Sequence, residues 1–111
     1  MTGTIPTEIG TMSNLIELNL KSNSLEGPIP SEIGQITNLR DIYLNTNDLT
    51  QNIPIEFGML SNLRNLHVTG NLLSGEVPLE VCQLLTENLK LFAGVCSPTF
   101  NCDCCEPCFE R

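Results

Sequence analysis

Basic residues are scarce in this chain of 111 residues. Five lysines and arginines stand against 13 aspartates and glutamates, which gives a formal net charge of −8 at pH 7. Nucleic acids and anionic membrane surfaces are bound through clusters of Lys and Arg. The charge balance therefore argues against nucleic acid and against an anionic membrane surface as the partner.

Long apolar runs are missing as well. No run of about 18 apolar residues occurs, so no part of this segment is expected to insert directly into a membrane. The first residues have neither the basic start nor the apolar stretch of a secretory signal peptide. Any secretion signal would have to lie outside these residues.

Motifs for catalysis and cofactor binding are also lacking. The chain has a single histidine, His67, and no glycine-rich phosphate loop, nucleophile elbow or protein-kinase catalytic loop. A lone histidine on the polar side of a strand is more often an exposed contact residue than a catalyst. The sequence predicts a protein that is not an enzyme and that has no cofactor and no metal site.

What the sequence does contain is a repeat. Residues 39–49 follow the leucine-rich repeat pattern Leu-x-x-Ile-x-Leu-x-x-Asn-x-Leu. The same frame recurs at an equal interval before and after this stretch, beginning at Leu15 and at Leu63. Three matches in register predict a solenoid of stacked units, because a single unit cannot bury its apolar face alone.

A second half-unit follows each leucine-rich stretch, with the approximate form Gly-x-Ile-Pro-x-Glu-Ile-Gly. It recurs at residues 3–10, 27–34, 52–58 and 75–82. A 24-residue repeat with Leu-x-Gly-x-Ile-Pro after the asparagine resembles the plant-type leucine-rich repeat family of receptor ectodomains, receptor-like proteins and secreted polygalacturonase inhibitors. The resemblance covers residues 1 to about 96. It implies an α/β repeat solenoid: a right-handed coil with a short parallel sheet on the concave face and 3-10 or other short helices on the convex side.

Short strands are expected near residues 16–20, 40–44, 64–68 and 88–92, where apolar and polar residues alternate. The core residues expected from this sheet are Leu18, Leu20, Ile42, Leu44, Leu66 and Val68. The opposite wall of the core is expected to consist of Ile5, Ile9, Ile29, Ile33, Ile53, Phe57, Val77 and Val81.

Each convex helix is expected to begin with proline at its first helical position, where a missing N–H costs nothing. These prolines are Pro6, Pro30, Pro54 and Pro78. A glutamate follows two residues later in each unit, where the positive helix end stabilises a carboxylate. We interpret Glu8, Glu32, Glu56 and Glu80 as a solvated face at helix starts rather than a cation site.

The repeated asparagines are predicted to be structural. Asn23, Asn47 and Asn71 occupy the point where each strand ends and the chain bends. A buried amide both donates and accepts hydrogen bonds, so a ladder of asparagines can pair the backbone groups that the bend leaves without partners.

The fourth unit departs from the frame. One residue is missing between Leu84 and Leu89, and the asparagine position becomes Gly94. We therefore expect about four units over residues 1–96, starting in mid-repeat as part of something longer, and a cysteine-rich C-terminal cap over residues 97–111.

All six cysteines lie from position 82 onward. Their even number and clustering favour disulfides in an oxidising compartment. Four thiolates within seven residues could instead bind zinc or another soft metal, but the spacing lacks the usual paired knuckles. The disulfide candidates are Cys82, Cys96, Cys102, Cys104, Cys105 and Cys108.

The frame also predicts which side chains face a partner. Equal repeat positions should lie side by side on the concave sheet, with Glu17 beside Asp41 and Tyr43 beside His67. Two adjacent carboxylates repel each other, and a purely structural sheet has no need of that repulsion. The predicted partner-binding residues are Glu17, Asn19, Asp41, Tyr43, Asn65, His67 and Lys90.

These features favour a non-enzymatic module that binds a protein or peptide ligand. The resemblance implies that it belongs to an extracellular or cell-surface receptor-like or secreted recognition protein. Two other hypotheses stay open from the sequence: an inhibitor of a secreted cell-wall hydrolase, and a purely structural repeat segment.

Overall fold

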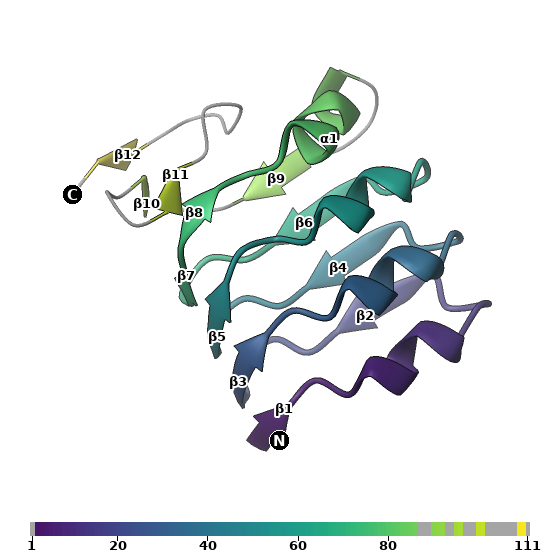
Figure 1. Ribbon diagram of the computed structural model, residues 1–111, viewed down its shortest axis with the longest axis horizontal. Helices are drawn as coiled ribbons and strands as arrows, with labels where there is room; N and C mark the ends of the chain where they lie inside the picture. The colour runs from purple at the N-terminus through teal and green to yellow at the C-terminus, as the bar shows by residue number, and fades with distance from the viewer. Residues whose placement is uncertain (1, 87–89, 93–94, 97–99, 102–108, 111) are drawn as a thin grey trace.

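The computed structural model describes residues 2–86, 90–92, 95–96, 100–101 and 109–110. The chain coils along one axis, and each turn adds a strand to a parallel sheet (Figure 1). Within the described residues, no helix is long and apolar enough to cross a membrane. The strands of this sheet, in spatial order, are β2 (Glu17–Asn19), β4 (Asp41–Tyr43), β6 (Asn65–His67) and β9 (Lys90–Phe92).

The predicted register is confirmed in the first three units and is wrong in the fourth. Leu18 pairs with Ile42, and Ile42 pairs with Leu66, so equal positions of successive repeats lie side by side. In the fourth unit Leu66 pairs with Leu91, whereas the sequence frame had placed Leu89 there. From Leu66 to Leu91 the chain is therefore one residue longer than a 24-residue repeat, whereas the expectation was one residue shorter, a difference of two residues. An even shift keeps the same face of the strand toward the core, so the apolar pattern alone could not detect it.

A second parallel sheet, which the sequence did not predict, flanks the coil. It consists of β1 (Thr2–Thr4), β3 (Ser24–Pro28), β5 (Asp48–Gln51) and β7 (Leu72–Leu73). Thr2 pairs with Ser24 and Glu26 pairs with Asp48, so the paired residues are slightly less than one repeat apart and equal repeat positions are staggered. Glycine and proline disfavour strands, and their presence in this segment favours a turn in any sequence-based prediction.

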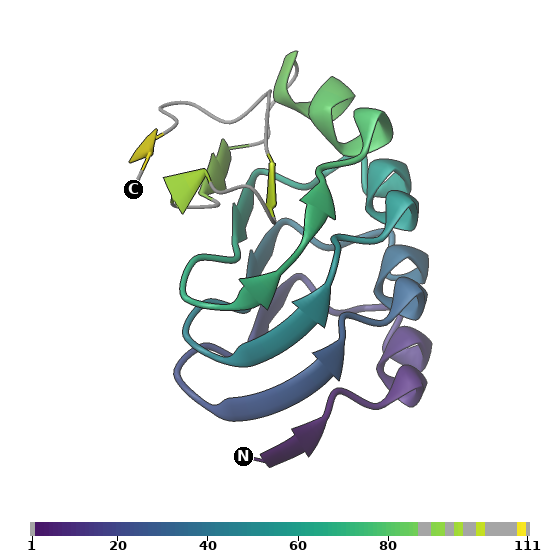
Figure 2. The same ribbon diagram turned by 60° about the vertical axis from the view of Figure 1, so that its left-hand side comes forward.

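The convex side carries short helices, stacked one above another along the coil (Figure 2). Their shortness suits 3-10 rather than α geometry. They are η1 (Thr7–Thr11), η2 (Ser31–Gln35), η3 (Ile55–Met59), α1 (Leu79–Cys82) and η4 (Gln83–Thr86).

The prolines lie one position earlier than expected. Each is the N-cap, with extended backbone, as shown by Pro30 at φ −65° and ψ 135°. Its carbonyl accepts the first helical hydrogen bond, from Ile33 N at 3.2 Å. Because the fixed φ of proline suits both an extended residue and a helical one, sequence could not separate the two positions.

The two walls of the coil enclose one apolar core, and the predicted core residues lie in it. Ile33, Ile42, Leu44, Phe57 and Leu66 have no exposed surface. Ile9 and Leu20, which occupy equivalent positions in the first unit, are only partly buried. They lie on the last described turn at that end of the stack, so no earlier unit covers them.

Residues near the C-terminus add two further strand pairs. β11 (Phe100–Asn101) pairs with β8 (Gly75–Glu76), and β10 (Val95–Cys96) pairs with β12 (Phe109–Glu110). Most of the predicted cap, including Cys102, Cys104, Cys105 and Cys108, lies outside the described residues. The division at residues 96 and 97 stays a prediction.

Glycines on the convex side set how closely the units pack. A Cβ on Gly34 would lie 2.6 Å from the Glu56 carbonyl oxygen of the next unit, and Gly10 meets Glu32 at 2.7 Å in the same way. Neither contact is possible for a real side chain. Glycine at this position therefore allows one helix to stack on the next.

We expect Gly34→Ala to lower the free energy of unfolding by about 1–3 kcal/mol, because the new methyl group forces the helices of two units apart. Urea denaturation of the purified protein measures this effect. The matched control is Gln35→Ala, an exposed neighbour in the same helix. Equal stability of the two variants would contradict this account of the packing.

Candidate functional site on the concave sheet

The concave sheet places most of the predicted contact residues on one surface. Glu17 and Asn19 are exposed on β2, Tyr43 is half-buried on β4, and Asn65 and His67 are half-buried on β6. Tyr43 lies between Asn19 and His67 in the register of the sheet. Parallel pairing thus brings together side chains that are one full repeat apart in sequence.

An aromatic pair occupies the middle of this surface. The rings of Tyr43 and His67 meet edge to face, with centroids 4.9 Å apart and planes at 61°. The Lys21 ammonium group lies 6.0 Å from the centre of the Tyr43 ring, at the outer limit of a cation–π contact. Lys21 was not among the predicted contact residues. It follows Asn19 by two residues, so the alternation of the strand already places it on the same outward face.

Asp41 does not present its carboxylate to solvent, and this corrects the sequence prediction. The residue is only 6% exposed. Asn65 Nδ2 donates to Asp41 Oδ1 at 2.7 Å, and Arg64 Nε donates to the same oxygen at 3.2 Å. Arg64 Nη2 donates to the other carboxylate oxygen at 3.4 Å. The expected acidic pair of Glu17 and Asp41 is therefore replaced by one exposed carboxylate and one that is engaged within the sheet.

The pKa of Asp41 reflects this environment. Burial raises it, but hydrogen bonds from Asn65 and Arg64, together with the charges of Arg64 and Arg40, outweigh burial and leave the pKa below its ordinary value of 3.8. The carboxylate thus stays ionised at neutral pH. Sequence reasoning missed Arg64 because this residue precedes the strand and was therefore not counted among the outward-facing residues of the sheet.

Lys90 also changes place. The frame had put it in the column of Tyr43 and His67, but it pairs with Asn65 in the sheet, and Phe92 takes the register position beside His67. The side chains of β9 are outside the described part of the structure. Their role in any contact therefore stays a prediction.

Two of the repeated asparagines, Asn47 and Asn71, connect successive units, while Asn23 Nδ2 donates to Leu20 O and Lys21 O within its own unit. Asn47 Nδ2 donates to Leu44 O in its own unit at 3.1 Å and to Leu20 O in the preceding unit at 2.9 Å. Its Oδ1 accepts from Leu25 N at 3.1 Å. Asn71 repeats the arrangement one unit later, with Leu44 O at 2.9 Å and Leu49 N at 3.0 Å. Backbone groups at each bend are thereby paired.

Among the described residues, no group of three or more His, Cys, Asp or Glu side chains could hold a metal ion. What the concave surface offers is an aromatic pair with hydrogen-bonding and charged neighbours. Such a composition suits recognition of another molecule.

The coil, its parallel sheet and its asparagine ladder define a leucine-rich repeat solenoid. The family profile described as Leucine Rich Repeat matches residues 14–36 and 62–84. A comparison with curated protein sequences gives no match. With its 24-residue units and its plant receptor neighbours among solved structures, the chain belongs to the plant-type leucine-rich repeat family.

Three solved structures illustrate the likeness. The crystal structure of PEPR1–AtPEP1 has a TM-score of 0.81 and 35% identity, and the match covers 92% of this chain and 14% of that one. The Arabidopsis receptor kinase HAESA ectodomain, in complex with an IDA peptide hormone ligand, has a TM-score of 0.78 and 27% identity over 88% and 17%. A plant ice-binding protein has a TM-score of 0.79 and 34% identity over 85% and 30%. The chain thus spans less than a third of each of these proteins.

The environment of His67 predicts a pH dependence. Burial and then the Lys21 charge lower the pKa of His67 below 6.5, although the Asp41 charge opposes them. As the pH falls below 6.5, the unfolded chain therefore takes up this proton before the folded chain does. The contribution of His67 to stability is lost through the window between 6.5 and the lowered folded pKa.

We expect the free energy of unfolding of the wild type to fall across this window, and His67→Gln to show a smaller fall. Urea denaturation at a series of pH values measures both slopes. Glu17→Gln is the control, because it removes a nearby exposed charge that is not a cause of the His67 shift. Parallel slopes in the wild type and His67→Gln would show that His67 is not responsible.

Proposed function

We propose that the chain is a receptor-like, non-enzymatic module that binds a peptide or protein ligand on its concave sheet. The observation that carries this proposal is the Tyr43–His67 pair, with its centroids 4.9 Å apart. Both residues lie half-buried on the two middle strands of the sheet and are not part of the buried core. Tyrosine is one of the three residue types, with tryptophan and arginine, that most often dominate binding energy at interfaces.

The neighbours of this pair define the chemistry of the ligand. Glu17 and Asn19 are exposed on one side, and Lys21 approaches Tyr43 from the same unit. Because the Asp41 carboxylate is already hydrogen-bonded, a basic group on the ligand would contact Glu17 alone. An apolar or polar-aromatic group would pack on Tyr43. The ligand expected is a short extended peptide or a protein loop that combines these two features.

The structural neighbours support binding of this kind. HAESA is a receptor kinase whose ectodomain was solved with a peptide hormone ligand. The plant ice-binding protein, at 34% identity, shows that the same solenoid also serves a different purpose. The proposal therefore rests on the residues of the concave sheet, and the fold alone does not decide it.

We further propose that the chain acts outside the cell or at its surface. The plant receptor ectodomains to which it is similar support this location. Cys82 packs half-buried against the core, and the clustering of all six cysteines from this position onward suits disulfides in an oxidising compartment.

All six cysteines are expected to form intramolecular disulfides, with Cys104 and Cys105 joined to different partners because a bond between neighbours strains the geometry. Non-reducing peptide mapping by mass spectrometry tests this expectation. Each bond is expected to contribute about 2–4 kcal/mol. Six reduced thiols, or stoichiometric zinc in the purified protein, would instead support a metal site in the Cys-x-Cys-Cys-x-x-Cys run.

Tyr43→Ala is expected to weaken ligand binding by at least about 1 kcal/mol, because it removes the aromatic centre of the surface. The chain would be screened against secreted plant peptides and, in a parallel arm, against cell-wall polygalacturonases with inhibition of hydrolysis as the readout. Calorimetry then compares variants with the ligand that binds.

The control is Leu72→Ala, which removes an exposed apolar side chain from the second sheet. Both variants are first checked for unchanged thermal unfolding. Unchanged binding by Tyr43→Ala would move the site off the concave sheet. Inhibition of a polygalacturonase without peptide binding would support the inhibitor hypothesis instead.

A further inference from the structure

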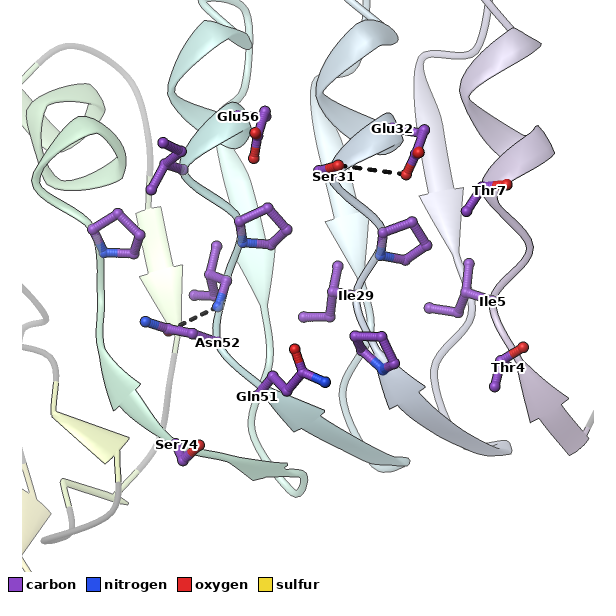
Figure 3. Close-up of a pocket in the computed structure, with 16 residues that line it drawn as sticks. Thr4, Ile5, Thr7, Ile29, Ser31, Glu32, Gln51, Asn52, Glu56 and Ser74 are labelled. Atoms are coloured by element: carbon purple, nitrogen blue, oxygen red, sulfur yellow. Dashed lines mark hydrogen bonds between the residues drawn. The ribbon is translucent and has the colours of Figure 1, made fainter.

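A groove of about 900 Å³ runs along the flank of the coil, between the second sheet and the convex helices (Figure 3). Its walls come from successive units, so the same repeat positions recur along it. Ile5, Ile29 and Ile53 line its floor and are at most 4% exposed. Pro28, at the end of β3, and Ile55, at the start of η3, also line it, and Ile55 is 56% exposed. The groove is therefore apolar and open to a partner.

Charge is strongly segregated around this groove. The second sheet and the convex helices, over residues 2–12, 24–35, 48–59 and 72–83, contain acidic residues and no lysine or arginine. The described basic side chains, those of Lys21, Arg40 and Arg64, lie in the segments that form the concave sheet. These segments thus carry seven carboxylates and no lysine or arginine: Glu8, Glu26, Glu32, Asp48, Glu56, Glu76 and Glu80.

Two of these carboxylates belong to the groove itself. Glu32 and Glu56 line its helical rim, each in the first turn of its helix. They carry the same charge on stacked units, and no salt bridge in the described part of the chain involves either residue. A cationic partner would relieve this repulsion, whereas an anionic one would increase it.

The side-chain amide of Gln51 also lines the groove, although the backbone of this residue has an unfavourable conformation. Its φ is +66°, in the left-handed region, and the equivalent positions in the other units are Gly3, Gly27 and Gly75. A residue with a Cβ costs about 1–2 kcal/mol in this conformation. The Gln51 side chain is exposed and lines the groove (Figure 3), where its amide can pair with the backbone of a bound chain.

We propose that this groove is a second interaction surface, distinct from the concave sheet, and that it docks an extended basic segment of a partner protein. In an extended segment, alternate side chains point to opposite faces. Apolar residues on the face toward the groove would pack on Pro28 and the exposed Ile55. The long side chains of lysines or arginines between them would bend back over the helical rim to reach Glu32 and Glu56. The Gln51 amide would hydrogen-bond the backbone of the segment.

The probe for the test is a short, capped, fluorescent peptide in which lysine alternates with valine, and its counterpart has glutamate in place of lysine. Fluorescence anisotropy at physiological ionic strength measures binding to the purified chain. The lysine peptide is expected to bind and the glutamate peptide is not. Backbone amide shifts in NMR spectra should change along residues 28–32 and 51–56 and stay unchanged at Tyr43 and His67.

Three variants separate the contributions that the apolar contact, the two carboxylates and the Gln51 amide make to peptide binding. Ile55→Ala and the double variant Glu32→Gln, Glu56→Gln are each expected to weaken binding about fivefold or more. Gln51→Gly is also expected to weaken binding while the protein keeps or gains thermal stability, because glycine relieves the strained backbone. A loss of binding in this variant therefore cannot come from unfolding.

The matched controls are Met59→Ala, at an exposed residue of the same helix outside the groove, and Glu17→Gln on the concave sheet. Both should bind the lysine peptide as the wild type does. Equal binding of the glutamate peptide, loss only in the charge variant, or amide shifts confined to the concave sheet would each overturn the proposal. Tyr43→Ala leaves this binding unchanged if the two surfaces are independent.

Discussion

The hydrogen bonds of the asparagine ladder are the constraint on which the rest of the structure depends. Each coil must bend after its concave strand, and a bend in the interior leaves backbone groups without partners. Asn47 resolves this by donating to carbonyls of two units, Leu20 and Leu44, and by accepting from Leu25 N. Leaving such groups unpaired costs about 1–3 kcal/mol each. Because the same amide spans two units, it also fixes how one coil lies on the next.

That fixed stacking gives the molecule two surfaces of different character. On the concave side, pairing at an interval of one full repeat aligns equal repeat positions and brings Tyr43 onto His67. On the flank, the paired residues are slightly less than one repeat apart, and the apolar groove opens between the second sheet and the helices. Basic residues of the described units belong to the first surface, while the second is acidic. One repeat therefore gives the coil two surfaces that differ in shape and in charge.

Asp41 shows why the concave site could be predicted only in part. Its repeat position placed it correctly beside Glu17 and Asn65. The repeat pattern, however, treats every outward-facing residue of the sheet as exposed. It does not show whether a side chain from a neighbouring unit covers that residue or hydrogen-bonds to it. Arg64 reaches Asp41 in this way and, with Asn65, turns an expected acidic contact into an ion pair between a buried carboxylate and an exposed guanidinium group. The chemistry at Asp41 changes although the residue stands at its predicted position in the register.

The sequence by itself determined the repeat length, the apolar core, the asparagine ladder and the convex helices, because each depends on a residue type that recurs at a fixed spacing. Tertiary structure decided the second sheet, the pairing of Lys90 with Asn65, the burial of Asp41 and the groove. These features depend on how units are staggered and on which side chains cross between them. Periodicity records which face a residue occupies, but the distance between two side chains is set only when the coils pack.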